Sequence, residues 1–275
     1  MTPVSSERVR PAAVAGMFYS RDARELAHGV DTMLAAAPQP APSAALPKAI
    51  IAPHAGYVYS GPIAASVYAR LKPARGSIRR IVLLGPTHRV AVRGLALPDA
   101  DAFATPLGIV PIDDEAIAVL AKLPQVTTSS AAHAFEHSLE VHLPFLQSVL
   151  GSFTLVPLAV GYTEARQVAE VLDALWGGRE TLIVISSDLS HYHPYTEAQA
   201  IDQRTADAIL RLETDITHEQ ACGATPVIGL NLAAQRRRLR PQLLDLRNSG
   251  DTAGDRGRVV GYGAFAYFEN AGNEH

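Results

Sequence analysis

Apolar runs alternate with amphipathic segments along the chain, a pattern typical of a sheet covered by helices. Four short runs rich in Ile, Val and Leu predict buried strands near residues 48–52, 80–84, 153–160 and 181–185. Fully apolar strands of this kind are typical of the interior of a parallel sheet. Further strands are expected at residues 243–246 and 259–268, with short edge strands between residues 94 and 113.

The segments between these strands show the spacing of apolar residues that a helix requires. Leu139, Leu143, Leu146 and Leu150, for example, form the apolar stripe of a helix expected over residues 136–150. The other helices are expected at residues 21–37, through Ile63 to Leu71, and at 113–123, 164–176, 196–212 and 226–235. The predicted fold class is therefore α/β, with a mainly parallel central sheet flanked by helices on both faces.

The chain is expected to form one domain. Its 275 residues lie near the upper size for a single hydrophobic core. The only linker-like run, residues 36–42, joins an expected helix to the first core strand. We expect a single domain over 1–275, with a folded core at 10–269 and a disordered tail at 270–275.

Composition excludes some classes of protein. The formal net charge of −3 argues against a nucleic-acid binder, which usually has a basic surface. No stretch reaches the roughly 18 apolar residues that cross a bilayer, and residues 1–19 lack the apolar core of a signal peptide. We therefore expect no nucleic-acid or membrane partner, and a cytoplasmic location.

Polar residues follow three of the apolar strands at the point where each strand ends. His54 follows the first strand and His88 the second, and Asp188 follows the strand at 181–185, with His191 three residues further on. In open parallel sheets, ligands bind beyond the carboxyl ends of the strands. A histidine after one strand is more often a loop residue with no function. Three strand ends with the same pattern instead favour a shared pocket.

Cys222 is the only cysteine, so no intrachain disulfide can form. It precedes the helix expected near residue 226, and a helix N-terminus stabilises a thiolate, the form that binds metals. The alternative is a small buried apolar residue. Local features favour neither interpretation.

The segment from Phe135 to Phe145 is rich in ionisable residues. His137 and Glu140 are three apart and could share a helix face, whereas His142 projects elsewhere. The spacing is not that of the H-E-x-x-H zinc motif, so a zinc-protease interpretation fails. One of the two histidines could line the pocket while the other makes a hydrogen bond in the core.

Several motifs together resemble the Memo family, and they follow one another in order from about residue 11 to residue 269. They are Met17-Phe18-Tyr19, Ala52-Pro53-His54-Ala55-Gly56-Tyr57-Val58-Tyr59-Ser60-Gly61, Gly85-Pro86-Thr87-His88, Glu136-His137-Ser138-Leu139-Glu140-Val141-His142-Leu143-Pro144-Phe145, Ser186-Ser187-Asp188-Leu189-Ser190-His191, Cys222-Gly223 and Gly261-Tyr262-Gly263. Motifs of this length in this order are highly specific.

The resemblance implies a fold like that of class III extradiol dioxygenases, which hold non-haem Fe(II) with two histidines and a glutamate. Carried over by motif, His54 and His88 are the metal histidines, and Cys222 stands where the carboxylate would be. His191 resembles the acid–base histidine, with Asp188 beside it. The substrate-pocket candidates are Tyr57, His137 and His142. Because a thiolate is a softer ligand than a carboxylate, copper or zinc could replace the expected Fe(II).

Three functions are compatible with these residues. The first is a metal-dependent oxidoreductase, in which His191, polarised by Asp188, moves protons. The second is a binding module or adaptor that recognises a small molecule or peptide in the same pocket, and the third is a fold with structural histidines. The resemblance also implies AMMECR-like and radical SAM proteins as partners. Animal members of the family are described as redox-active metal binders and as phosphopeptide-binding adaptors.

Overall fold

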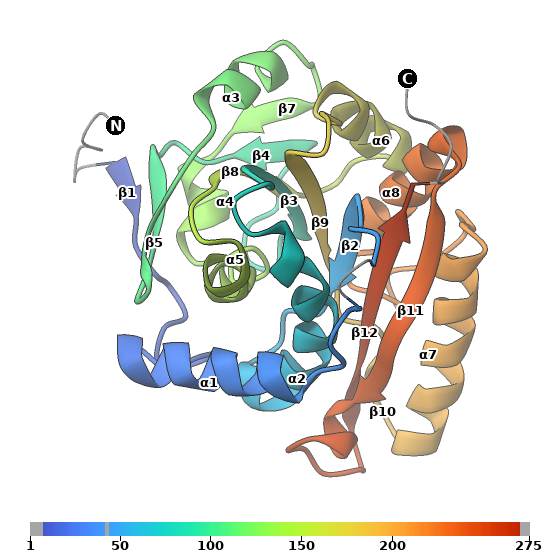
Figure 1. Cartoon of the computed structure of the whole chain (residues 1–275). Helices are drawn as coiled ribbons and strands as arrows, with labels where there is room; N and C mark the ends of the chain where they lie inside the picture. Colours follow the sequence, from blue (N-terminus) through green and yellow to red (C-terminus); the bar gives the residue numbers. More distant parts are fainter. Residues whose placement is uncertain (1–7, 42–43, 270–275) are drawn as a thin grey trace.

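The computed structural model describes residues 8–41 and 44–269, so the tail predicted at 270–275 lies outside the described residues. A large mixed sheet runs through the middle of the molecule (Figure 1). Its strand order is β10-β12-β2-β9-β3-β8-β4-β7. The remaining strand, β11, also pairs with β12.

Four parallel strands form the centre of this sheet. They are β2 (Ala49–Ala52), β9 (Thr181–Ser186), β3 (Arg80–Pro86) and β8 (Thr154–Val160). Every residue of β2 and β9 is buried, as expected for strands covered on both faces. The four strands predicted from apolar runs are confirmed.

On each side of this centre the next strand runs antiparallel to it. On one side β12 (Val259–Phe268) runs against β2 and pairs with β11 (Arg240–Asn248) and β10 (His191–His193). On the other side β4 (Leu95–Leu97) runs against β8 and pairs with β7 (Val126–Thr128). A separate small sheet contains β1 (Val9–Arg10), β5 (Ala102–Thr105) and β6 (Gly108–Pro111).

Helices cover both faces of the central sheet, as predicted. One face packs against α1 (Ala23–Ala36), α2 (Tyr57–Tyr68), which continues into η2 (Ala69–Ala74), and α5 (Leu143–Leu150). The other packs against α3 (Asp114–Leu120), α6 (Ala165–Ala174), α7 (Tyr195–Leu210) and α8 (Ala224–Arg237). The short α4 is Ser130–Ala134, and η4 is Ser249–Asp251. Within the described residues, no helix combines the length and apolar character needed to cross a bilayer.

The helix expected over residues 136–150 is wrong in its first half. A single 3-10 turn, η3 (Glu140–His142), precedes α5, which begins only at Leu143. The Glu136 carboxylate accepts hydrogen bonds from the backbone N–H groups of His137 and Ser138, which holds this stretch in a turn. Pro144 then lies in the first turn of α5, where its missing N–H costs no helical hydrogen bond.

Three neighbouring strands of the parallel centre end at the same edge. In each case a polar residue follows two positions after the end of the strand: His54 after β2, Asp188 after β9 and His88 after β3. The strands are adjacent, and their registers place Ala52 beside Ser186 and Leu84 beside Ile185. Parallel pairing therefore brings the three polar residues to one place.

A buried ion pair fastens the N-terminal segment to the body of the protein. Arg10 in β1 pairs with Glu140 in η3, and both side chains are almost fully buried. Glu140 also accepts hydrogen bonds from the backbone N–H groups of Ala13, at 2.8 Å, and Val14, at 3.0 Å, and from the Tyr19 hydroxyl. The carboxylate thus has four donors that replace water.

Glu140→Gln should lower the free energy of unfolding by about 3–5 kcal/mol, because it leaves the Arg10 charge buried without a partner. The matched control is Asp99→Asn, which removes an exposed carboxylate paired with Arg8 and should cost at most about 1 kcal/mol. Urea denaturation measures both variants. Equal small losses would contradict a structural role for the buried pair.

Candidate metal centre

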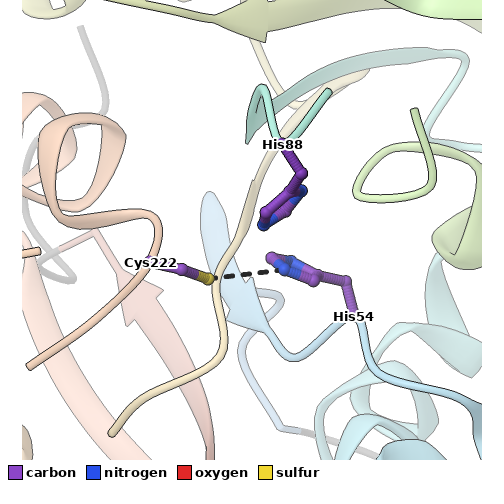
Figure 2. A group of neighbouring side chains, drawn as sticks. All are labelled: His54, His88 and Cys222. Atoms are coloured by element: carbon purple, nitrogen blue, oxygen red, sulfur yellow. Dashed lines mark hydrogen bonds between the residues drawn. The ribbon is translucent and has the colours of Figure 1, made fainter. Parts of the chain in front are cut away.

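Three side chains that can bind a metal meet at the carboxyl edge of the parallel strands (Figure 2). His54 follows β2, His88 follows β3, and Cys222 lies just before α8. One nitrogen of each histidine and the cysteine sulfur all lie within 4.8 Å of one another. His54 Nε2 and Cys222 Sγ are 3.4 Å apart. The three residues could therefore hold one ion.

The loop before α8 packs directly on the end of β9, and this contact places Cys222. The Gly223 N–H donates to Ser187 Oγ at 3.0 Å, and the Cys222 N–H donates to the Asp188 carbonyl at 3.2 Å. A Cβ atom at position 223 would lie only 2.6 Å from the Ser186 carbonyl oxygen. Only glycine therefore permits this close approach.

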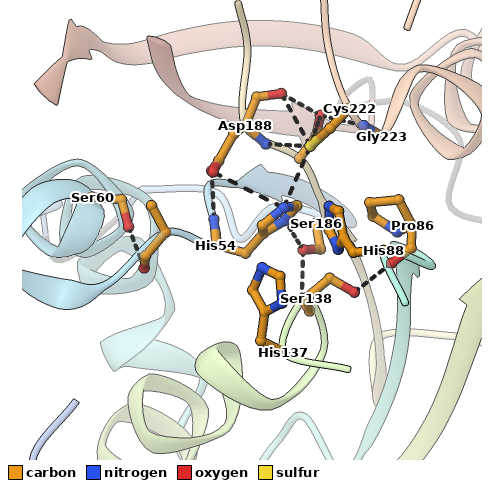
Figure 3. Close-up of polar contacts among 12 residues, drawn as sticks. His54, Ser60, Pro86, His88, His137, Ser138, Ser186, Asp188, Cys222 and Gly223 are labelled. Carbon is orange, nitrogen blue, oxygen red and sulfur yellow. Dashed lines mark hydrogen bonds and ion pairs between the residues drawn. The ribbon is translucent and has the colours of Figure 1, made fainter. Parts of the chain in front are cut away.

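Two hydrogen bonds of Ser186, one with His54 and one with the Ser138 carbonyl, set the tautomer of His54 (Figure 3). Ser186 Oγ lies 2.6 Å from His54 Nδ1 and donates its own proton to the Ser138 carbonyl, also at 2.6 Å. The serine oxygen must then accept the Nδ1 proton, so His54 Nε2 carries a lone pair that faces Cys222 Sγ. Burial, followed by the charges of the neighbouring histidines, lowers the pKa of His54 well below its ordinary value. The ring is neutral, as a metal ligand must be.

Glu136 orients His88 in the same way. Its carboxylate accepts from the His88 backbone N–H at 2.6 Å and from Nδ1 of the ring at 2.8 Å. Burial opposes ionisation of Glu136, but the hydrogen bonds from His88 lower its pKa to about 2. The permanent negative charge keeps the ring proton on Nδ1, which leaves His88 Nε2 for a metal. Carboxylate–histidine pairs of this kind recur around protein-bound metals.

The Cys222 thiol is protonated when no cation is near. Burial, and then the charge of Asp188, raises the pKa of Cys222 to about 12, despite a hydrogen bond of 3.3 Å from the Asp188 N–H to Sγ. Desolvation thus outweighs the hydrogen bonds from Asp188, Ser187 and Gly223 that favour the thiolate. A thiolate at this position requires the charge of a bound cation.

Asp188 holds the His54 segment. Its Oδ1 accepts from the His54 backbone N–H at 2.7 Å, and its Oδ2 lies 4.0 Å from His54 Nε2. The second contact is not an ion pair, because His54 is neutral. Burial raises the pKa of Asp188 to about 7, although the backbone hydrogen bonds from His54 and Ala55 act in the opposite direction. This carboxyl therefore changes charge near neutral pH.

His191 has a different partner from the one we expected. Its Nδ1 lies 2.8 Å from the Leu189 carbonyl, whereas the sequence suggested Asp188. A carbonyl can only accept, so Nδ1 carries the proton and Nε2 carries the lone pair. Burial lowers the pKa of His191, and the ring is partly exposed. His191 is therefore a neutral base at pH 7, oriented by the backbone.

The His137 ring lies beside His54 and His88, whereas the His142 ring does not. The His137 ring stacks on His88 with centroids 4.6 Å apart and meets His54 edge-on at 5.5 Å. His142 is buried in the core, with its Nδ1 2.8 Å from the Tyr68 hydroxyl. The alternative left open by the sequence is thus resolved: His137 lies at the candidate site and His142 makes a core hydrogen bond.

A second metal group, formed by His88, Glu136 and His137, is geometrically close but chemically less suitable. Glu136 Oε1 already accepts from His88 Nδ1 and from the backbone N–H groups of His137 and Ser138. An oxygen with three donors has little capacity left for a cation. We therefore assign Glu136 to orienting His88.

Tyr57, the third pocket candidate, has its hydroxyl engaged elsewhere. It donates to the Val141 carbonyl at 2.6 Å, and the ring packs against Tyr19 and Phe145. Tyr57 lines a cavity of about 420 Å³ between α1 and α2. That cavity lacks the three metal-binding side chains.

Sequence reasoning missed Glu136, Ser138 and Ser186. Glu136 stood in a segment already noted for its ionisable residues, and its position directly before His137 was the available signal. Nothing local, however, separates it from Glu140, which faces Arg10 instead. The serines gave no signal, because their role depends on the contact between β9 and the 136–139 turn.

Solved structures with a similar fold are known. The crystal structure of uncharacterized protein JW3007 from Escherichia coli K12 superposes with a TM-score of 0.51, over 79% of this chain and 98% of that chain. The two sequences are 14% identical. This likeness supports the α/β architecture alone.

Much closer sequence relatives are known. A MEMO1 family protein of Aquifex aeolicus is 38% identical over 93% of this chain and 97% of its own length. One from Ignicoccus hospitalis is 36% identical over 94% and 98%, and one from Sulfolobus acidocaldarius 34% identical over 92% and 97%. Residues 10–266 also match the family described as Memo-like protein. This chain therefore belongs to the Memo family.

Proposed function

We propose that this protein is a metal-dependent oxidoreductase that holds one Fe(II) ion through His54, His88 and Cys222, with copper or zinc as alternatives. The observation that carries the proposal is the orientation of the two imidazoles. Ser186 and Glu136 each contact an Nδ1 atom, so the Nε2 atoms of both rings are left for a metal. Two imidazole nitrogens and a sulfur atom within 4.8 Å of one another suit a divalent or soft cation.

The thiol supports the same proposal. Cys222 is partly exposed and lies beside Asp188, and an ionised thiol there would need a positive charge to offset both desolvation and the carboxylate. A metal ion would supply that charge, because a coordinating thiol loses its proton. When bound, iron or copper would contribute one-electron chemistry and open positions for a substrate.

His191 is the candidate acid–base residue. The Leu189 carbonyl fixes the ring so that Nε2 is the atom free to accept a proton from a substrate. The lowered pKa keeps it neutral at pH 7, which suits a general base. Because Asp188 holds His54 instead, the two residues would act separately.

The second candidate is a binding module that turns over no substrate. This function is favoured by a hydrogen bond that needs no ion: the Cys222 thiol can donate to His54 Nε2. Metal analysis of protein purified without oxygen, followed by an oxygen-consumption assay with candidate substrates, separates the two functions. Bound metal without oxygen uptake would support the binding module.

Metal binding should release about one proton per ion at pH 8.5. Asp188, with a pKa of about 7, is then already ionised, whereas Cys222, with a pKa of about 12, still carries its proton. The metal must displace that proton, so the apparent affinity should rise with pH. Calorimetric titration in buffers of different ionisation enthalpy measures the number of protons released per ion. Binding without proton release would show that the thiol is not a ligand.

Cys222→Ser should weaken metal binding by at least about 10–100-fold, the loss typical of removing even an outer partner. Cys222→Glu should retain Fe(II) but lose preference for copper, because it provides a harder ligand. Anaerobic competition titrations measure both variants.

The matched control for these titrations is His218→Ala. His218 lies four residues before Cys222 and contacts its carbonyl, but it is exposed and outside the donor group. It should bind metal as the parent does. Parent-like affinity in Cys222→Ser would remove the cysteine from the site.

His191→Ala should lower turnover by about 10²–10⁴-fold with near-normal metal content, because it removes a proton acceptor and no ligand. The control is His193→Ala, which removes a partly exposed ring paired with Glu197 and should leave turnover unchanged. Steady-state rates and metal analysis provide the two readouts. Equal loss of metal and turnover would make His191 a ligand.

A further inference from the structure

The two residues before His191 are held in place through their backbone. The Leu189 N–H donates to the Gly261 carbonyl and the Gly261 N–H donates to the Ser190 carbonyl, both at 2.8 Å. The Leu189 carbonyl accepts from Nδ1 of the His191 ring, also at 2.8 Å. One backbone group of these two residues is left, the Ser190 N–H. A buried amide of this kind needs an acceptor, because an unpaired one costs free energy.

The acceptor is a carboxylate from a helix on the other side of the segment. Asp202, on α7, is 2% exposed, and its Oδ1 accepts from the Ser190 N–H at 2.9 Å. Burial raises the pKa of Asp202 to about 6, although the hydrogen bonds from Ser190 and the charge of His193 act in the opposite direction. Above pH 7 the group is therefore mainly ionised, and its oxygens can only accept.

Gly261 leaves the space that this carboxylate occupies. A Cβ atom at position 261 would overlap the carboxyl group of Asp202. Only glycine therefore allows β12 to pair with Leu189 and Ser190 while Asp202 lies against it. This close approach explains the first glycine of the 261–263 motif, which the metal group does not.

The chain directly after His191 is strained. Tyr192 has a φ angle of 64°, in the left-handed region that favours glycine, and the pairing of β10 with β12 is irregular between His191 and His193. A backbone in this region persists only where neighbouring contacts hold it. The hydrogen bond between Ser190 and Asp202 is such a contact, two residues before the strained position.

We propose that Asp202 is a positioning residue for His191. Its carboxylate holds the Ser190 N–H, and this keeps the Leu189 carbonyl against Nδ1 of the ring. The proton then stays on Nδ1, and Nε2 keeps the lone pair that accepts a proton. The proposal rests on the proposed function, in which His191 is the acid–base residue. It assigns the support of that ring to a helix residue in place of Asp188.

The test determines the tautomer of the neutral His191 ring by ¹⁵N NMR at pH 8, where a protonated and an unprotonated ring nitrogen give separate signals. In the parent the proton should be on Nδ1. Asp202→Ala removes the acceptor, so the Nε2–H form, which an unrestrained histidine prefers, should become the major one. Asp202→Asn keeps an acceptor oxygen for Ser190 and should therefore keep the tautomer of the parent.

The matched control is Ala206→Gly, one helical turn after Asp202. Ala206 is fully buried on α7, and glycine in the middle of a helix is destabilising. This variant should unfold at a lower temperature than the parent and still keep the proton of His191 on Nδ1. It separates the loss of one acceptor from a general weakening of the helix.

Three results would overturn the proposal. The first is the parent tautomer in Asp202→Ala. The second is loss of that tautomer in Asp202→Asn or Ala206→Gly, because any disturbance of α7 would then suffice. The third is rapid hydrogen exchange of the Ser190 N–H in the parent, a measurement that decides the question even if Asp202→Ala does not fold. None of these readouts needs a metal or a substrate, so a parent protein without turnover would count against the proposed function alone.

Discussion

The parallel pairing of β2, β9 and β3 is the constraint on which the candidate site depends. Parallel neighbours end at the same edge of a sheet, and here each strand is followed at the same distance by a polar residue: His54, Asp188 and His88. A shift of one residue in any register would move one of them out of the group. Because both faces of these strands are packed under helices, such a shift would also expose apolar side chains. The burial of apolar side chains that stabilises the core therefore also fixes the positions of the site residues.

Rigid hydrogen bonds then convert proximity into a defined arrangement. Ser186 and Glu136 contact Nδ1 of His54 and His88, so the Nε2 atoms of both rings are already directed before any ligand arrives. Such preorganisation reduces the cost of ordering ligands around an ion. Cys222 is the exception, because its thiol must still lose a proton. The affinity for a metal at this site would therefore depend on pH chiefly through the sulfur.

Much of the fold was predictable from the sequence because its central strands are continuous apolar runs, which few other structures tolerate. The convergence of His54, His88 and Asp188 followed from the same pattern. Cys222 could be added only through the family resemblance, since a lone cysteine before a helix has two equally good explanations. The contacts that decide protonation states were beyond sequence reasoning. Glu136 and Glu140 stand four residues apart, yet one orients His88 and the other pairs with Arg10. The role of each carboxylate depends on which distant segment of the chain it contacts.

X-ray absorption spectroscopy of the zinc-loaded protein, prepared without oxygen, tests the central claim most directly, because it reports the ligand atoms themselves. We expect one sulfur at about 2.3 Å and two imidazole nitrogens at about 2.0–2.1 Å, and the sulfur signal should be absent in a cysteine-free variant. A spectrum of the parent protein with only nitrogen and oxygen neighbours would contradict a site formed by His54, His88 and Cys222.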